Sequence, residues 1–467
     1  MNKYKKLGKN TALFMIGNFA QKLLGFVFVP IYTAVLSTEE YGTADLIVTL
    51  VSMLWPVFTI VINEACFRFL LENKKNEKEV TTIAFWINIA AILGMLLCSP
   101  VMSRISILKS YYPFYLAYFI IYTMDSFFSY AVRGLEKVQD YVIGGVINTV
   151  TTVLCNLVFL LVFDWGVEGY LLGYMMGMLG ADIWYLFRIK ICRYIRLPNK
   201  MDQTLLKNMV KYSVPMIPNS VSWWINNSSD RLMVTYFCGV AANGIYSVAY
   251  KIPSLLSVFS SVFMSAWQIS SVEDFGTEEN RTFFSSVYRK YISLNVMVVS
   301  CIVCLIQVIS RILFSKDFYA AYQIAPYLIF GSLFKNLSAF LGTIYTASKK
   351  TKMLFYSTMA GAILNIILNF ILLQKVGVVG AAIATLVSYF FVWLVRLMDT
   401  RKIIKLDTDM KKDVFLYLIL MLQILVWQFD ISGAMIWEVA LMCVVLFLER
   451  KDLIVMLKFG WAKVKRV

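Results

Sequence analysis

Charged side chains within long apolar stretches are the residues of this chain best placed to do chemistry. A charge near the centre of a bilayer costs at least about 2.5–3.5 kcal/mol, so such residues are rare unless they bind a substrate or ion or pair with one another. The candidates are Lys22, Glu64, Arg68, Asp125, Asp182, Asp230, Arg231, Lys251 and Lys335. The cations suit an anionic ligand, whereas the carboxylates suit protons, cations or neighbouring Lys and Arg side chains.

Four of these cations are predicted to form a substrate site. A rise of about 1.5 Å per helical residue puts Arg231 and Lys251 roughly 10 Å beneath the outer surface, on consecutive apolar segments. Lys22 and Lys335 lie near the middle of their segments. Lys and Arg bind phosphate oxygens through charge-assisted hydrogen bonds, so the set predicts a site for a large anionic head group. In the alternative, Arg231 pairs with Asp230 and Lys251 snorkels to the interface.

The apolar segment at 208–237 is unusually polar for a membrane helix. It carries Asn226 and Asn227 close to Trp223 and Trp224. Polar groups in such number cannot all face lipid. Amides can bond sugar hydroxyls while aromatic rings pack on the apolar faces of sugars, so these residues are predicted to bind a glycan. The alternative is hydrogen bonding between helices.

The carboxylates allow two interpretations. Asp125 and Asp182 could carry protons or ions in a coupled cycle, or pair with Lys or Arg in the first half of the chain. Glu64 lies one helical turn before Arg68, which predicts a structural ion pair.

Metal, cofactor and enzymatic functions are not predicted. Histidine is absent, and the eight cysteines are scattered, mostly within apolar stretches. No Gly-rich phosphate-binding loop occurs in a charged segment.

Apolar stretches of about 20 residues, the length needed to cross a bilayer, recur along the chain. The sequence is 60% hydrophobic and 15% charged, with a mean hydropathy of +0.70. We therefore predict an all-α integral membrane protein with about 14 transmembrane helices. The predicted spans are 12–36, 44–70, 80–101, 113–133, 140–163, 169–188, 208–237, 244–271, 285–314, 320–347, 353–373, 378–398, 414–430 and 433–448.

Lys and Arg occur mainly in every second loop. With the N-terminus inside, the cytoplasmic segments hold about 32 basic residues and the outer loops about 4. This asymmetry predicts a multi-pass protein with both termini in the cytoplasm. We expect it in the bacterial cytoplasmic membrane. The formal net charge of +16 is then explained by basic loops beside an anionic leaflet, and no nucleic-acid partner is predicted.

An internal repeat relates the two halves of the chain. Tyr41–Ala44 opens the second span as Asn243–Ala249 opens the eighth, and Gly166–Gly169 has a counterpart in Gly377–Gly380. Six spans separate each pair, so both copies enter the membrane in the same direction. The predicted organisation is a six-helix lobe at 1–190, a basic linker at 191–207, a second six-helix lobe at 208–400, and two additional helices with a basic tail at 401–467.

Three features of the sequence carry a family resemblance. They are the twelve repeated spans plus two, the run Asn-Gly-Ile-Tyr-Ser-Val-Ala-Tyr-Lys-Ile-Pro at 243–253, and Pro30-Ile31-Tyr32 followed by Tyr41-Gly42. The chain resembles polysaccharide-biosynthesis flippases of the multidrug/oligosaccharidyl-lipid/polysaccharide exporter superfamily. The resemblance implies alternating access that moves a polyprenyl-diphosphate-linked oligosaccharide to the outer leaflet, through a cavity lined chiefly by spans 1, 2, 7 and 8. It also implies polymerase and glycosyltransferase partners. Fourteen spans fit the lipid II flippase and sporulation-protein branches as well.

Two other functions fit the sequence less well. A small-cation drug exporter of the same superfamily would be expected to have a carboxylate-dominated cavity, and the excess of cations argues against it. A membrane polysaccharide polymerase or glycosyltransferase would be expected to carry catalytic carboxylates in a large outer loop, yet the predicted outer loops are short. The sequence specifies neither the glycan and its lipid carrier nor the coupling ion, the oligomeric state or the polysaccharide pathway.

Overall fold

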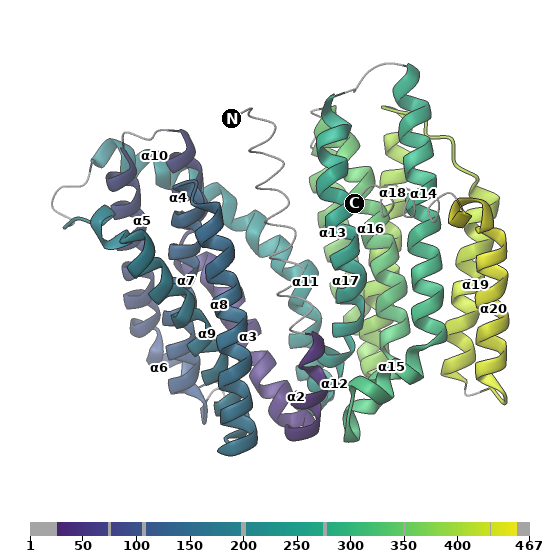
Figure 1. Ribbon diagram of the computed structural model, residues 1–467, viewed down its shortest axis with the longest axis horizontal. Helices are drawn as coiled ribbons and strands as arrows, with labels where there is room; N and C mark the ends of the chain where they lie inside the picture. The colour runs from purple at the N-terminus through teal and green to yellow at the C-terminus, as the bar shows by residue number, and fades with distance from the viewer. Residues whose placement is uncertain are drawn as a thin grey trace, which may run out of the picture. The chain divides into compact units, whose positions relative to one another are not determined.

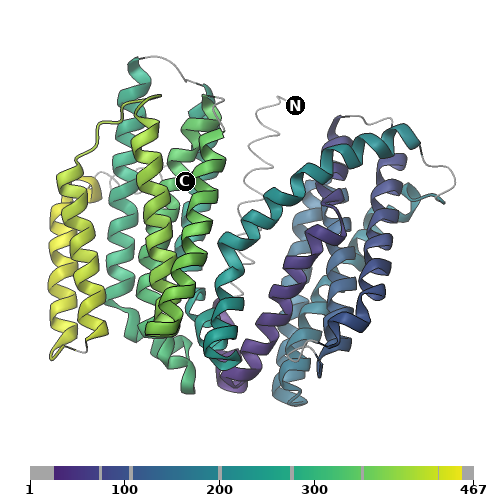
Figure 2. The ribbon, with the colours of Figure 1, turned by 180° about the vertical axis from the view of Figure 1, so that it is seen from behind.

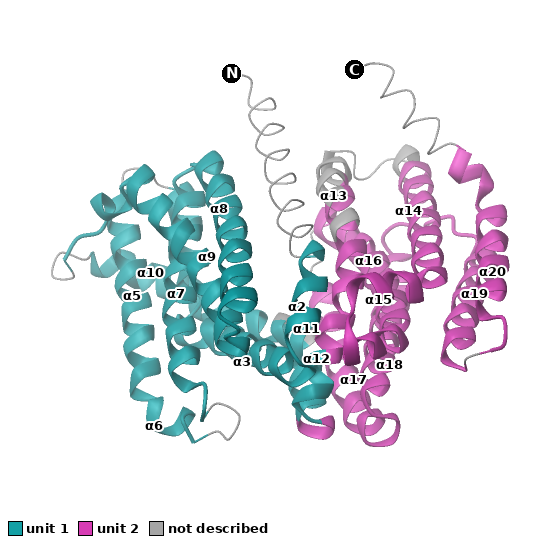
Figure 3. Cartoon of the chain, turned by 60° about the horizontal axis from the view of Figure 1, so that its bottom comes forward, with its two compact units in different colours: residues 1–235, 239–244 teal, residues 236–238, 245–467 magenta. Residues whose placement is uncertain are grey.

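The computed structural model describes residues 26–72, 76–104, 109–197, 202–273, 278–348, 352–429 and 431–454 (Figure 1). The chain forms two compact units (Figure 3). Unit 1 comprises residues 1–235 and 239–244, and unit 2 comprises residues 236–238 and 245–467. The boundary falls between residues 235 and 245, where α11 (Ile217–Cys238) ends and α12 (Val240–Ala249) begins.

Unit 1 is built from helices joined by short turns. They are α2 (Val29–Val35), α3 (Thr38–Phe58), α4 (Ile62–Glu72), α5 (Glu77–Leu97), α6 (Ser99–Met102), α7 (Tyr112–Gly134), α8 (Val138–Leu157), α9 (Gly166–Ile189), α10 (Gln203–Ser213), most of α11 (Ile217–Cys238) and the start of α12 (Val240–Ala249). A π-helical turn at Val158–Val162 extends α8, and 3₁₀ turns occupy Ile191–Tyr194 and Val214–Met216.

The predicted second span is two helices rather than one. A capping box starts α3, because the Ser37 hydroxyl accepts from the Glu40 backbone N–H while the Glu40 carboxylate accepts from the Ser37 N–H. The span therefore begins at Thr38, several residues earlier than predicted. It breaks between α3 and α4, where Ile60 and Val61 adopt left-handed backbone angles with φ of 46° and 56°.

The core of unit 1 lies among α4, α5, α7 and α9, and it includes part of the predicted linker. Ile191 and Met209 are fully buried in this cluster. The Trp86 indole of α5 donates to the Arg196 carbonyl oxygen over 2.9 Å. The first part of the 191–207 segment is therefore packed against the helices and is not a free tether.

Small residues let α8 and α9 approach closely. A Cβ added at Gly173 would lie 1.9 Å from Asn156 Oδ1, and one at Gly177 would lie 1.9 Å from Thr152 Oγ1. Any larger residue would push the helices apart, as expected for a small-residue packing face in a membrane.

Unit 2 continues with longer helices. They are α13 (Lys251–Glu273), α14 (Glu278–Cys304), α15 (Ile306–Leu313), α16 (Ala325–Ala347), α17 (Lys352–Val376), α18 (Val378–Thr400), α19 (Met410–Gln428) and α20 (Ala434–Leu448), with a 3₁₀ segment at Lys316–Gln323. Nearly all of α16 is buried. The final pair, α19 and α20, lie side by side in both views (Figure 1, Figure 2).

Polar contacts attach this final pair to α14. The Trp427 indole donates to the Val303 carbonyl over 2.8 Å, and the Ser293 hydroxyl donates to Glu449 over 2.6 Å. Buried Glu438 of α20 accepts from the Gln423 amide over 2.9 Å. The two additional helices are therefore integral to unit 2.

The all-α membrane fold is confirmed. Among the described residues, seven helices are long and apolar enough to span a membrane by length and composition. The Asn- and Ser-rich α11 is not one of them. From the second span onward the described helices follow the predicted spans, whereas most of the predicted span at 12–36 lies outside the described residues.

Candidate functional site

Arg231 of α11 forms an ion pair with Asp45 of α3. Arg231 Nη1 lies 2.8 Å from Asp45 Oδ1, and the two side chains are 25% and 15% exposed. Asp45 follows the start of α3 by seven residues, and Arg231 precedes the end of α11 by the same number, which places both about 10 Å from the predicted outer ends of their helices. Arg231 was expected to act alone or beside Asp230, so Asp45 is a new partner.

Asn243 holds the other carboxylate oxygen. Its side-chain amide is buried and donates to Asp45 Oδ2 over 3.5 Å and to the Gly42 carbonyl oxygen over 3.2 Å. The amide therefore fixes the position of Asp45 relative to the α3 backbone. Asp45 in turn orients the guanidinium of Arg231.

The two glycines of the sequence repeat meet at this point. A Cβ on Gly42 would lie 2.1 Å from the Val240 carbonyl oxygen, and a Cβ on Gly244 would lie 2.0 Å from the Thr38 carbonyl oxygen. Each glycine thus faces the carbonyl four residues before the other. The counterpart segments of the repeat are therefore in contact backbone to backbone, with an approximate two-fold relation.

A second contact joins α3 and α11 two turns further along. The Trp224 indole donates to Ser52 Oγ over 3.1 Å. Ser52 lies seven residues after Asp45, and Trp224 lies seven residues before Arg231, so the two helices run antiparallel with matched polar positions. We call Asp45, Ser52, Trp224 and Arg231 the α3–α11 seam.

The other residues of α11 that the sequence analysis proposed for a site differ in their burial. Asn227 is exposed and Asp230 is buried. Trp223 and Asn226 lie on the described helix, but their side chains are outside the described residues, and Lys22 is outside them altogether. The predicted glycan contacts of these residues remain predictions.

Lys251 and Lys335 belong to unit 2. Lys251 is the first residue of α13, after a turn at Tyr250 that separates α12 from α13. Lys335 is half-buried on α16, and its Nζ lies 5.5 Å from the centroid of the Tyr389 ring. Their joining a common site with Arg231 remains a prediction.

Asp125 and Asp182 come from α7 and α9 of unit 1. Asp182 is 4% exposed, and its Oδ1 atom has no hydrogen-bond partner in the described part of the chain. Within those residues neither carboxylate lies in an ion pair. The alternative of Lys or Arg pairing therefore finds no support in unit 1.

Arg68 pairs with Glu72 instead of Glu64. Its Nε lies 2.8 Å from Glu72 Oε1, and its guanidinium stacks 4.7 Å from the centroid of the Tyr212 ring. The predicted ion pair between Glu64 and Arg68 was therefore wrong. Both glutamates lie four residues from the arginine, so helical spacing alone could not choose between them.

A buried cation of unit 2 was missed by the sequence analysis. Arg396 is 6% exposed and donates to the Ser338 carbonyl, Ser357 Oγ and Thr358 Oγ1. It lies at the predicted cytoplasmic end of the 378–398 span, where basic residues are expected. Its hydrogen bonds tie α16, α17 and α18 together, which is a structural role.

Comparisons with known proteins place the chain in a family. The model described as "Polysaccharide biosynthesis protein" matches residues 7–268, and the MatE model matches residues 215–371. An uncharacterized membrane protein of Methanocaldococcus jannaschii is 24% identical over 416 residues, covering 83% of this chain and 96% of the relative. A probable low-salt glycan biosynthesis flippase of Haloferax volcanii, Agl15, is 24% identical over 226 residues, covering 48% of this chain and 47% of the relative.

Solved structures show the same fold at low identity. The lipid II flippase MurJ in an inward closed conformation matches with a TM-score of 0.67 at 15% identity, covering 96% of this chain and 99% of that one. An inward-facing multidrug resistance MATE transporter of the MOP superfamily matches with a TM-score of 0.66 at 12% identity, covering 82% and 94%. With the family model spanning more than half of its length, this chain belongs to the polysaccharide biosynthesis protein family.

Proposed function

We propose that this protein moves a polyprenyl-diphosphate-linked oligosaccharide from the inner to the outer leaflet by alternating access. The observation that carries the proposal is the α3–α11 seam, where the Asp45 carboxylate orients Arg231 about two turns from the end of α11. A guanidinium whose orientation is set by a carboxylate matches the geometry of diphosphate oxygens, which it binds through charge-assisted, bidentate hydrogen bonds. The family assignment and the flippase relative support the same substrate class.

Binding of charged and uncharged carriers tests this proposal. The purified protein is expected to bind a polyprenyl-diphosphate glycan at least ten-fold more tightly than a polyprenol carrying the same glycan. Added salt should reduce the difference where the site is open to water, since mobile ions screen exposed charges within about 8 Å at physiological ionic strength. Equal affinities would contradict the proposal, and preferential binding of small organic cations would indicate drug efflux instead.

Asp182 is the proposed coupling residue. A buried carboxylate without a hydrogen-bond partner among the described residues can take up and release a proton or a monovalent cation during the cycle. Asp182→Asn is expected to remove the dependence of transport on an imposed pH or sodium gradient while downhill exchange continues. Both activities can be measured in proteoliposomes: uptake driven by an imposed gradient, and exchange without a gradient. Unchanged gradient dependence in Asp182→Asn would exclude this residue from coupling.

The proposed orientation places the linker in the cytoplasm and the turn between α19 and α20 outside. On a cysteine-free background, retained Cys192 is expected to resist an impermeant thiol reagent in intact cells, whereas Ser432→Cys should react. Both positions are exposed, so access is set by the side of the membrane and not by burial. After cell lysis both should be labelled. The reverse pattern in intact cells would invert the topology.

A further inference from the structure

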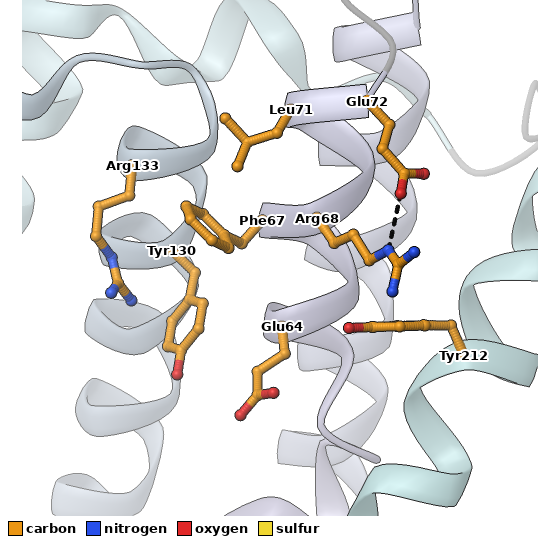
Figure 4. Close-up of a pocket in the computed structure, with 8 residues that line it drawn as sticks. All are labelled: Glu64, Phe67, Arg68, Leu71, Glu72, Tyr130, Arg133 and Tyr212. Carbon is orange, nitrogen blue, oxygen red and sulfur yellow. Dashed lines mark hydrogen bonds and ion pairs between the residues drawn. The ribbon is translucent and has the colours of Figure 1, made fainter. Parts of the chain in front are cut away.

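Unit 1 contains a cavity whose lining residues are not those of the α3–α11 seam. It has a volume of about 540 Å³ and is lined by Glu64, Phe67, Arg68, Leu71, Glu72, Tyr130, Arg133 and Tyr212 from α4, α7 and α10 (Figure 4). It lies where α4 and α7 end, next to the 71–79 and 134–139 loops that are predicted to be cytoplasmic. Its size is typical of small-molecule sites, which span about 300–1,000 Å³.

The charges of Arg68 and Glu72, on one side of the cavity, balance each other. Arg68 is paired with Glu72 and stacked on Tyr212, as Figure 4 shows. The ion pair within α4 balances both charges, and the stacking of Arg68 on Tyr212 attaches α10 to α4. The pair has little net charge to offer a ligand.

The remaining two charges are not paired in this way. Among the described residues Arg133 lies in no ion pair; its Nε donates to the Ser129 carbonyl over 3.3 Å, and its guanidinium stacks 4.2 Å from the Tyr130 ring centroid. Glu64 likewise has no hydrogen bond or ion pair within that part of the chain. In Figure 4 the Tyr130 ring lies between them. A single positive and a single negative group thus line one cavity without a direct ion pair between them.

We propose that this cavity binds a zwitterionic phospholipid headgroup, with the phosphate on Arg133 and a primary ammonium on Glu64. A guanidinium stacked on an aromatic ring can donate N–H groups to phosphate oxygens, and a carboxylate accepts hydrogen bonds from an ammonium. An anionic headgroup would meet Glu64 and the negative ends of α4 and α7, whereas a purely cationic amphiphile would meet Arg133. Leu71, 44% exposed at the rim, offers apolar surface to the lipid.

A lipid bound in this cavity would stabilise the position of α10. Tyr212 lies on α10, which continues through the turn at Val214–Met216 into α11 and so toward Arg231. A headgroup seated against α4, α7 and α10 would hold α10 in place. This inference goes beyond the proposed substrate, because the bound lipid is not the transported one.

Native mass spectrometry of the full-length protein with defined lipids tests the inference. Phosphatidylethanolamine is expected to be retained at least five-fold more than phosphatidylglycerol, and more than phosphatidylcholine, whose methylated ammonium cannot donate to Glu64. Arg133→Gln and Glu64→Gln should each remove the preference. Arg188→Gln is the matched control, because Arg188 is an exposed arginine of the same unit that faces Asp140 at 3.7 Å. It should retain the preference.

The wild-type protein supplies an independent measurement if either glutamine variant misfolds. Soluble glycerophosphoethanolamine should displace bound phosphatidylethanolamine, and glycerol phosphate at the same concentration should not. Equal retention of the ethanolamine and glycerol lipids, equal displacement by the two soluble compounds, or a preference that survives in folded Glu64→Gln would each overturn the inference. Because no transported glycan is present in these experiments, their failure leaves the proposed function untouched.

Discussion

Replacing Arg231 with alanine is expected to lower export of the lipid-linked glycan at least ten-fold. The change removes the guanidinium proposed to bind diphosphate and leaves the Asp45 carboxylate without its ion-pair partner. Export is measured as surface polysaccharide in cells that lack the native protein, with the amount of membrane-inserted protein determined in parallel. Arg188→Ala, which removes an exposed arginine of the same unit, should leave export unchanged.

A charge swap separates substrate binding from stability. In the double variant Asp45→Arg/Arg231→Asp the ion pair can re-form between the same helices, so the amount of protein should recover. Export should remain low, because the guanidinium now projects from α3 in place of α11. Full export in the swapped variant would show that the pair has only a structural role, and normal export in Arg231→Ala would remove Arg231 from the mechanism.

The second large effect is expected from adding a single methyl group at Gly42. A Cβ there would lie 2.1 Å from the Val240 carbonyl oxygen, a backbone atom that cannot move without shifting α12. Overpacking of this kind costs about 1–3 kcal/mol and sometimes more. Gly42→Ala and Gly244→Ala are therefore expected to lower the thermal unfolding temperature of the purified protein and to reduce export at least ten-fold.

Gly94→Ala is the control for the glycine variants. A Cβ at position 94 would lie 3.5 Å from the Phe58 ring, an ordinary contact distance. Alanine is also a better helix former than glycine by about 1 kcal/mol. It should keep or raise the unfolding temperature and leave export normal. Unaltered unfolding temperature and export in Gly42→Ala would show that the two backbones can separate freely at this contact.

The sequence predicted the helices well but placed the site less completely, and Asp45 shows why. The apolar pattern put the start of the second span at residue 44, which made Asp45 an edge residue. The capping box of Ser37 and Glu40 was present in the sequence, and it moves the helix start to Thr38. With that start Asp45 lies two turns inside, where a carboxylate needs a partner. The capping signal would have identified it.

Other features depended on tertiary contacts that no local pattern contains. Arg68 pairs with Glu72 and not with Glu64, and it also stacks on Tyr212, a residue far away in the sequence. The contact of Gly42 with Gly244 likewise joins two segments that the repeat identified as counterparts, without any indication that they touch. Periodicity gives the helices and their faces, whereas the pairing of those faces is set by the fold.

The left-handed break between α3 and α4 stores free energy in the backbone. A left-handed conformation costs about 1–2 kcal/mol for each L-residue, and Ile60 and Val61 are both β-branched, the type least suited to it. An unbroken helix from Thr38 to Glu72 would release about 2–4 kcal/mol by the same measure. The bent form is held by the buried amides of Asn63 and Asn88, which bond over 2.7 Å beside the break. The second span is therefore held in a bent form of higher backbone free energy. Removing the hydrogen bond between Asn63 and Asn88 should favour a straight helix.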